Sequence, residues 1–215
     1  KYIIMSVFTI DYSQDKFSLG RNTIILGGRG KGKTNLVLTN IFLKFHSKIN
    51  HLFVVSQDEK YREATDYIFQ EKHFLKIFEE IQALDRNETK LLIIDSMQTV
   101  TSSEFMGIAG SVGQVRGCIQ KVAEVVKKLN ISTIVIGHVT KEGTVAGPKV
   151  LEHLVDTVLY LEGDHNHLFR VLKTIKNRFG PVSEIGLFEM AEEGLKEVLN
   201  PSEMFLAERS KVSVG

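Results

Sequence analysis

Residues 27–34 read Gly27-Gly28-Arg29-Gly30-Lys31-Gly32-Lys33-Thr34, and this stretch decides the fold. It fits the pattern G-x-x-x-x-G-K-[ST], in which backbone amides and the start of the following helix bind phosphates. The flanks agree, because an apolar, β-branched run at 23–26 precedes the loop and a helical pattern at 35–43 follows it. The sequence therefore predicts a strand, a phosphate-binding loop and a helix, in this order. A chance glycine-rich turn is the alternative.

The loop predicts ATP and Mg²⁺ as cofactors. Lys33 is expected to meet the β and γ phosphates, and the Thr34 hydroxyl is expected to bind Mg²⁺. Arg29 and Lys31 add charge to the loop, or they are simply solvated. The expected nucleotide-binding residues are Gly27, Gly28, Arg29, Gly30, Lys31, Gly32, Lys33, Thr34 and Asn35.

Length and composition favour a single intracellular domain. The 215 residues, 43% of them hydrophobic, suffice for one substantial core. The 27 Lys and Arg nearly cancel the 26 Asp and Glu, so no global basic field argues for nucleic acid. The single cysteine, Cys118, excludes an internal disulfide and a Cys-x-x-Cys zinc site. We expect an ATPase domain over residues 1–206, a tail over 207–215, a cytoplasmic location, and neither zinc nor membrane as partner.

Three further strands are expected to end in polar residues beside the phosphate loop, because ligand groups gather at the carboxyl ends of parallel strands. The run at 51–55 leads to Asp58 and Glu59; one of them would be the general base for water attack, or both are solvated acids. The run at 91–94 ends in Asp95, a Walker B arrangement that orients Mg²⁺. The run at 132–137 ends in His138, which would sense the γ-phosphate or be structural.

The rest of the chain predicts elements that surround this edge. Residues 60–90 have a helical pattern and are expected to cover one face of the sheet. A loop rich in small residues, 101–113, leads into an amphipathic helix whose apolar face contains positions 115, 119, 122, 126 and 129. Further strands are expected near 156–162, 168–176, 182–190 and 195–198. The histidines at 153, 165 and 167 are interpreted as solvated rather than as metal ligands.

One late strand ends in Lys176-Asn177-Arg178-Phe179-Gly180. Two cations spaced two residues apart on a strand point to the same side. In a ring of subunits such cations can reach the ATP of the next subunit and stabilise charge on the γ-phosphoryl oxygens. The alternative is an ordinary basic hairpin end.

From residue 94 onward the sequence resembles the RecA-type ATPase core of the bacterial RadA (Sms) DNA repair family. The Lys-Asn-Arg-Phe-Gly box is a hallmark of that family. The matching segments are 94–99, 110–116, 137–143, 146–153, 176–180 and 200–206.

This resemblance implies a hexameric, DNA-dependent ATPase that drives branch migration in recombinational DNA repair. It implies that loops 101–116 and 139–149 line a central DNA channel, and that Lys176 and Arg178 act in trans. The acid at 58 or 59 falls where RecA-like enzymes keep the water-activating glutamate, although 57–60 read Gln-Asp-Glu-Lys rather than the family's Gly-Glu-Glu-Ser. The implied DNA contacts are Arg116, Lys141 and Lys149.

The first half, at 26–42 and 52–56, resembles viral DNA-packaging ATPases of the poxvirus type, which suggests a hybrid of two P-loop lineages. A packaging or translocating ATPase is therefore one rival function, and an ATP-binding but catalytically idle module is another. A small-molecule kinase is disfavoured, because no acceptor-binding or lid signature is present. We expect a RecA-like P-loop NTPase with a mainly parallel central sheet, flanking helices and antiparallel strands at its C-terminal end.

Overall fold

A computed structural model describes residues 10–11, 16–17, 21–42, 51–56, 68–69, 90–139, 151–163, 169–192 and 194–199. Its helical segments are α2 (Lys33–Asn35), the π-helical η1 (Leu36–Phe42), the 3₁₀ turn η4 (Met97–Thr99) and α5 (Val112–Leu129). Its strands are β1 (Ile10–Asp11), β2 (Lys16–Phe17), β3 (Asn22–Gly27), β4 (His51–Ser56), β5 (Ile68–Phe69), β6 (Lys90–Asp95), β7 (Ser132–His138), β8 (Thr157–Glu162), β9 (Phe169–Asn177), β10 (Ile185–Ala191) and β11 (Gly194–Glu197).

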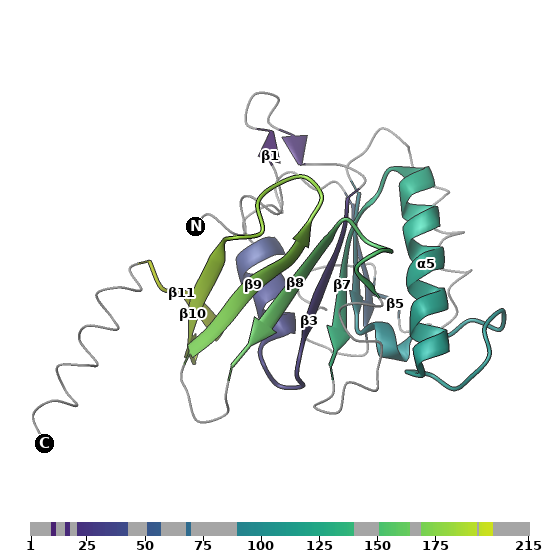
Figure 1. Ribbon diagram of the computed structural model, residues 1–215, viewed down its shortest axis with the longest axis horizontal. Coiled ribbons are helices and arrows are strands. Elements are labelled where there is room, and N and C mark those ends of the chain that lie inside the picture. Colours follow the sequence, from purple (N-terminus) through teal and green to yellow (C-terminus); the bar gives the residue numbers. More distant parts are fainter. Residues whose placement is uncertain are drawn as a thin grey trace, which may run out of the picture.

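The described part of the chain forms one nine-stranded sheet in the order β11-β10-β9-β8-β3-β7-β6-β4-β5, with β1 and β2 paired separately. The strands from β8 to β5 run parallel, whereas β9, β10 and β11 are added antiparallel. In Figure 1, β3, β7 and β8 end at the bottom of the view and β9 ends at the top. The predicted mixture of parallel and C-terminal antiparallel strands is confirmed.

The central strands β3, β4, β6 and β7 are buried on both faces, so their successive residues enter opposite cores. On one face, η1 supplies Leu36 and Val37, which pack with strand residues such as Ile25 and with Leu195 of β11. On the other face, α5 packs on residues such as Ile24. Its apolar stripe is the predicted one, with Cys118 as a buried core residue; the α5 residues of this core are Val115, Cys118, Ile119, Val122 and Val126.

Two elements differ in detail from the expected pattern, although most of the stretch 60–90 lies outside the described residues. The helix after the glycine loop has only three α-helical residues before it widens into the π-helical η1. Within the stretch 60–90, Ile68 and Phe69 form the short strand β5, which pairs in parallel with β4. The helical periodicity there did not reveal that β4 still offers an unpaired edge, whose backbone groups favour one more strand. Among the described helices, none is long and apolar enough to cross a membrane.

Candidate nucleotide-binding site

The glycine loop follows β3 directly and turns at two glycines. Gly30 and Gly32 have φ angles of 72° and 93°, in the left-handed region that favours glycine. Gly32 also begins the helix, because its carbonyl accepts the backbone N–H of Leu36 at 2.8 Å. A Cβ at Gly32 would lie 3.0 Å from Leu195 Cδ1, so β11 closes tightly over the loop. Arg29, by contrast, is exposed, as expected for a solvated loop cation.

Lys33 is a buried cation at the centre of the site, with 4% of its surface exposed. Its ammonium donates to the Gly27 carbonyl at 2.9 Å and to the Gly28 carbonyl at 2.8 Å. It also lies 3.0 Å from His138 Nδ1. Burial lowers the pKa of Lys33 from 10.5 to about 8, and the carboxylate of Asp95 opposes this shift. The ammonium is thus held at the loop, where an anion would relieve the unfavourable desolvation.

His138 is brought to the loop by strand register, because β7 pairs with β3 so that His138 lies opposite Gly27. An ammonium can only donate, so Nδ1 must accept and the ring proton sits on Nε2. Burial lowers the pKa of His138, and the charges of Lys33 and Arg29 lower it further against the attraction of Asp95. The ring is therefore neutral at pH 7, and its Nε2–H can donate to a phosphate oxygen.

Thr34 and Asp95, which the sequence predicts as Mg²⁺ ligands, contact each other in the structure. The Thr34 hydroxyl donates to Asp95 Oδ2 at 2.5 Å, although the residues come from α2 and from the end of β6. A hydroxyl and a carboxylate are both hard oxygen donors, the ligand type that Mg²⁺ prefers. These two side chains therefore fit the expected metal, and they lie beside Lys33 at the end of the glycine loop.

Gln98 is a site residue that was not predicted from the sequence. It lies on η4, three residues after Asp95, and its Nε2 donates to the His138 carbonyl at 3.0 Å. Its Oε1 is buried and has no hydrogen-bond partner among the described residues. Gln98 therefore ties the ends of β6 and β7 together. A polar residue shortly after the expected Walker B strand was the only signal in the sequence.

Asn35 does not turn its side chain to the loop as a nucleotide ligand would. Its Oδ1 accepts the backbone N–H of Leu195 at 2.7 Å, so the side chain fastens β11 to the first helical turn. Asp58 and Glu59 lie outside the described residues. Their strand, β4, ends at Ser56, which pairs with Asp95.

Lys176 and Arg178 lie at the opposite end of the central strands, where the parallel strands begin. β9 runs antiparallel to β8, so that Asn177 pairs with Thr157 at the start of β8. The glycine loop instead leaves the end of β3, and β3 is parallel to β8. Five residue steps along β3 separate the two ends by roughly 17 Å, at about 3.3 Å per residue. These cations are therefore remote from the nucleotide loop of their own chain.

The predicted DNA contacts are only partly described. Arg116 is exposed on α5, whereas Lys141 and Lys149 lie outside the described residues. The loop before α5 is held by Gln114, whose amide donates to the carbonyls of Ser102, Phe105 and Gly107. At its tip Met106 is 94% exposed and Ile108 is 82% exposed. A fixed backbone thus presents two apolar side chains to solvent.

Together, the glycine loop at the end of a central parallel strand, the Thr34–Asp95 pair and the antiparallel C-terminal strands define a RecA-like P-loop domain. Solved structures agree on the fold. The RadB recombinase matches with a TM-score of 0.58 and 20% identity, covering 85% of this chain and 92% of that one. A second solved structure, an isolated ATPase domain, matches with a TM-score of 0.68 and 11% identity, covering 83% of this chain and 84% of that one.

Curated sequences confirm the resemblance to RadA. The DNA repair protein RadA of Rickettsia conorii is 43% identical over 208 residues, 92% of this chain and 47% of the relative. RadA of Bacillus subtilis is 38% identical over 234 residues, 99% of this chain and 51% of the relative. The chain is thus a relative of the RadA proteins, and it spans about half of their length. The similarity includes the first half, and no protein-family model matches the chain.

Proposed function

We propose that this chain is a Mg²⁺-dependent, DNA-stimulated ATPase of the RadA type that works as a ring and drives branch migration in recombinational DNA repair. The observation that carries the proposal is that the phosphate-binding residues and the two cations Lys176 and Arg178 lie at opposite ends of the central strands. Lys33, Thr34, Asp95 and His138 gather at the glycine loop, while Arg178 and its neighbouring lysine lie at the far end. A second subunit would bring such cations to the loop.

The residues at the loop divide the work of phosphate binding. Backbone amides of the loop and the Lys33 ammonium would hold the triphosphate, with Nε2–H of His138 as a further donor. Thr34 and Asp95 would hold Mg²⁺, which when bound neutralises phosphate charge and orients the oxygens. Lys33 would exchange its two carbonyl acceptors for phosphate oxygens, so binding would recover the cost of burying an ammonium.

Hydrolysis needs a general base and a further cation that stabilises the charge developing on the γ-phosphoryl group. The glycine loop itself provides neither. We assign the base to Asp58 or Glu59, which come two and three residues after Ser56 in the sequence; Ser56 ends β4 and pairs with Asp95. We assign the stabilisation of γ-phosphoryl charge to Lys176 and Arg178 of the next subunit, because a cation supplied in trans can raise turnover by about 10³–10⁵.

DNA contact is assigned to the face formed by the 101–111 loop and the start of α5. Met106 and Ile108 would pack against bases, Arg116 would contact phosphate, and Lys141 and Lys149 would contribute from the 139–149 loop. The 101–111 loop follows η4, which carries Gln98 and adjoins Asp95. DNA at this face would therefore act on the metal and γ-phosphate end of the site through a short, well-packed connection.

The test is the ATPase rate with and without single-stranded DNA, together with the oligomer mass. Lys33→Ala should abolish ATP binding and turnover, and Arg178→Ala should abolish turnover with binding retained. Mixing the two variants should restore activity, because some interfaces then combine an intact loop with an intact Arg178. Lys127→Ala, which removes an exposed cation of α5, is the matched control.

Each outcome separates the proposal from its rivals. ATP binding by the parent without turnover would establish the idle module instead. Failure of the mixed variants to regain turnover would refute the action of Arg178 in trans. DNA stimulation that survives in the Met106→Ser, Ile108→Ser double variant, with Leu199→Ser as an exposed apolar control, would remove the assignment of the DNA face.

A further inference from the structure

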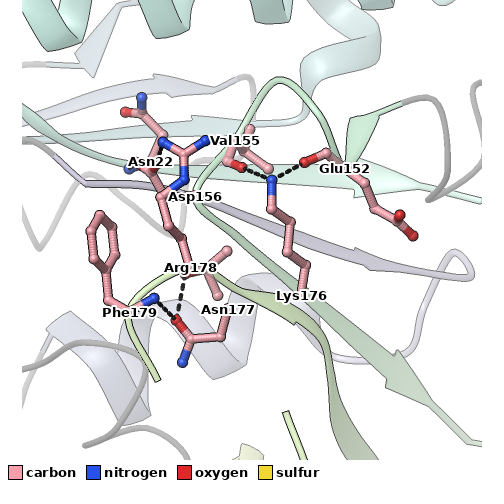
Figure 2. Close-up of polar contacts among 9 residues, drawn as sticks. Asn22, Glu152, Val155, Asp156, Lys176, Asn177, Arg178 and Phe179 are labelled. Atoms are coloured by element: carbon pink, nitrogen blue, oxygen red, sulfur yellow. Dashed lines mark hydrogen bonds and ion pairs between the residues drawn. The ribbon is translucent and has the colours of Figure 1, made fainter. Parts of the chain in front are cut away.

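Arg178 is fixed to Asp156 by two contacts. One guanidinium nitrogen, Nη1, donates to Asp156 Oδ1 at 2.8 Å, and the Arg178 backbone N–H donates to the Asp156 carbonyl at 3.0 Å. Figure 2 shows the two residues side by side at the start of β8 and the end of β9. A carboxylate and a guanidinium form a charge-assisted hydrogen bond, which fixes direction as well as distance.

The same aspartate is also tied to the strand that carries the glycine loop. Asp156 Oδ2 accepts the backbone N–H of Asn22 at 3.1 Å, and the Asp156 backbone N–H donates to the Asn22 carbonyl at 3.0 Å. Asn22 is the first residue of β3. Asp156 therefore connects Arg178 to the far end of the strand that leads to Gly27.

The two partners differ in how far their side chains are exposed to solvent. The Asp156 side chain is 13% exposed, whereas that of Arg178 is 55% exposed. A mostly buried carboxylate thus holds a guanidinium that reaches the surface and keeps further N–H donors there. The arrangement suits a cation that has to be presented to a second molecule.

The neighbours of Arg178 are held as well. Lys176 donates to the backbone carbonyls of Glu152 and Val155, in the turn that ends at Asp156 (Figure 2). Asn177 Oδ1 accepts the backbone N–H of Phe179 at 3.2 Å, and the Phe179 ring lies 4.2 Å from the guanidinium of Arg21. The box is thus positioned by the 152–156 turn and the start of β3.

We propose that Asp156 is a positioning residue for Arg178, which orients the guanidinium toward the nucleotide of the neighbouring subunit. This inference rests on the proposed action of Arg178 in trans. A purely structural role, in which Asp156 only closes the β8–β9 ladder, makes a different prediction. The Arg178 side chain is 55% exposed and stays solvated when its partner loses charge, so a positioning role predicts a large loss of turnover with little change in melting temperature.

The test is Asp156→Asn, which removes the charge but keeps an oxygen that can accept the Asn22 N–H. Its kcat should fall by at least about tenfold, because small misplacements of a catalytic group cost up to about 10² in rate. Its KM for ATP, nucleotide affinity and melting temperature should stay near those of the parent. Asp156→Glu, which keeps the charge and moves it by one methylene, should lose a smaller part of kcat. Glu124→Gln, on the exposed side of α5, is the charge-matched control.

A double variant identifies the route of the effect. If Asp156 works through Arg178, Asp156→Asn should cost nothing further in the Arg178→Ala background. In mixed assemblies, Asp156→Asn should regain activity with Lys33→Ala and should regain none with Arg178→Ala. Parent-like kcat in a folded Asp156→Asn or Asp156→Glu variant, or additive losses in the double variant, would overturn the inference. An inactive parent, or no recovery on mixing Lys33→Ala with Arg178→Ala, would instead refute the proposed function.

Discussion

Replacing Lys33 by methionine should abolish nucleotide binding and yet stabilise the nucleotide-free chain. The pKa of Lys33 is about 8 in the folded chain, against 10.5 as its ordinary value. At about 1.4 kcal/mol per pKa unit, the buried ammonium costs roughly 3 kcal/mol of folding free energy at pH 7. Methionine has a similar length and no charge, so this cost disappears.

Lost hydrogen bonds offset part of the gain. The Gly28 carbonyl loses its 2.8 Å bond to Lys33, while the Gly27 carbonyl still accepts the Val139 N–H at 3.2 Å. Leaving the Gly28 carbonyl and His138 Nδ1 without this donor costs roughly 1–2 kcal/mol. We therefore expect Lys33→Met to raise the free energy of unfolding by about 1–2 kcal/mol at pH 7.

The pH dependence provides the decisive measurement. Because the folded pKa lies below the unfolded one, the cost in the parent is fully present below about pH 8 and is relieved between pH 8 and 10.5. The advantage of Lys33→Met should thus shrink by roughly 2 kcal/mol between pH 7 and 9.5. Urea unfolding of both chains without nucleotide measures this difference, with the exposed Lys127→Met as control. A destabilised Lys33→Met variant at pH 7, or a constant difference across this range, would refute the reasoning.

Three further predictions follow from the same contacts. ATP affinity should weaken above pH 8, by up to about tenfold per pH unit, because the nucleotide-free chain then loses the Lys33 proton that a phosphate requires; calorimetric titration at pH 7 and 9.5 tests this. Asp95→Asn should leave the Thr34 hydroxyl with a neutral acceptor and lower Mg²⁺-dependent turnover by about 10² or more. The Mg²⁺ concentration for half-maximal turnover should rise, and a value equal to that of the parent would contradict the prediction. Gln114→Ala should lower the free energy of unfolding by roughly 2 kcal/mol and speed hydrogen exchange at the Ser102 amide, whose acceptor is Gln114 Oε1. An unchanged exchange rate would show that the loop keeps its conformation without Gln114.

The local parts of the site were predictable from the sequence. A glycine loop between a strand and a helix indicates its own conformation, and each buried apolar run indicates where its strand ends. Parallel strands bring their carboxyl ends to one edge, so the sequence alone placed Asp95 and His138 near Lys33. In the structure His138 lies 3.0 Å from the Lys33 ammonium, and Asp95 accepts a hydrogen bond from Thr34, the residue after Lys33.

The parts that depend on register and on distant partners were not predictable. Nothing near Asp156 in the sequence marks it as the partner of Arg178, 22 residues later, or of Asn22, 134 residues earlier. These contacts exist only once β8 is paired with both β3 and β9. The role of Gln114 is hidden for a similar reason, since its side chain bonds to backbone N–H and carbonyl groups of the loop, which any sequence supplies.

The placement of Asp156 bears on how neighbouring sites would communicate. β3 is buried along its whole length, with Asn22 held by Asp156 at one end and Gly27 beginning the nucleotide loop at the other. A buried strand hydrogen-bonded on both sides moves as a unit rather than bending locally. A shift of the loop on binding or releasing nucleotide would therefore be transmitted along β3 to the Asp156–Arg178 pair. In a ring, the state of one subunit's nucleotide would in this way adjust the cation that it offers to the next.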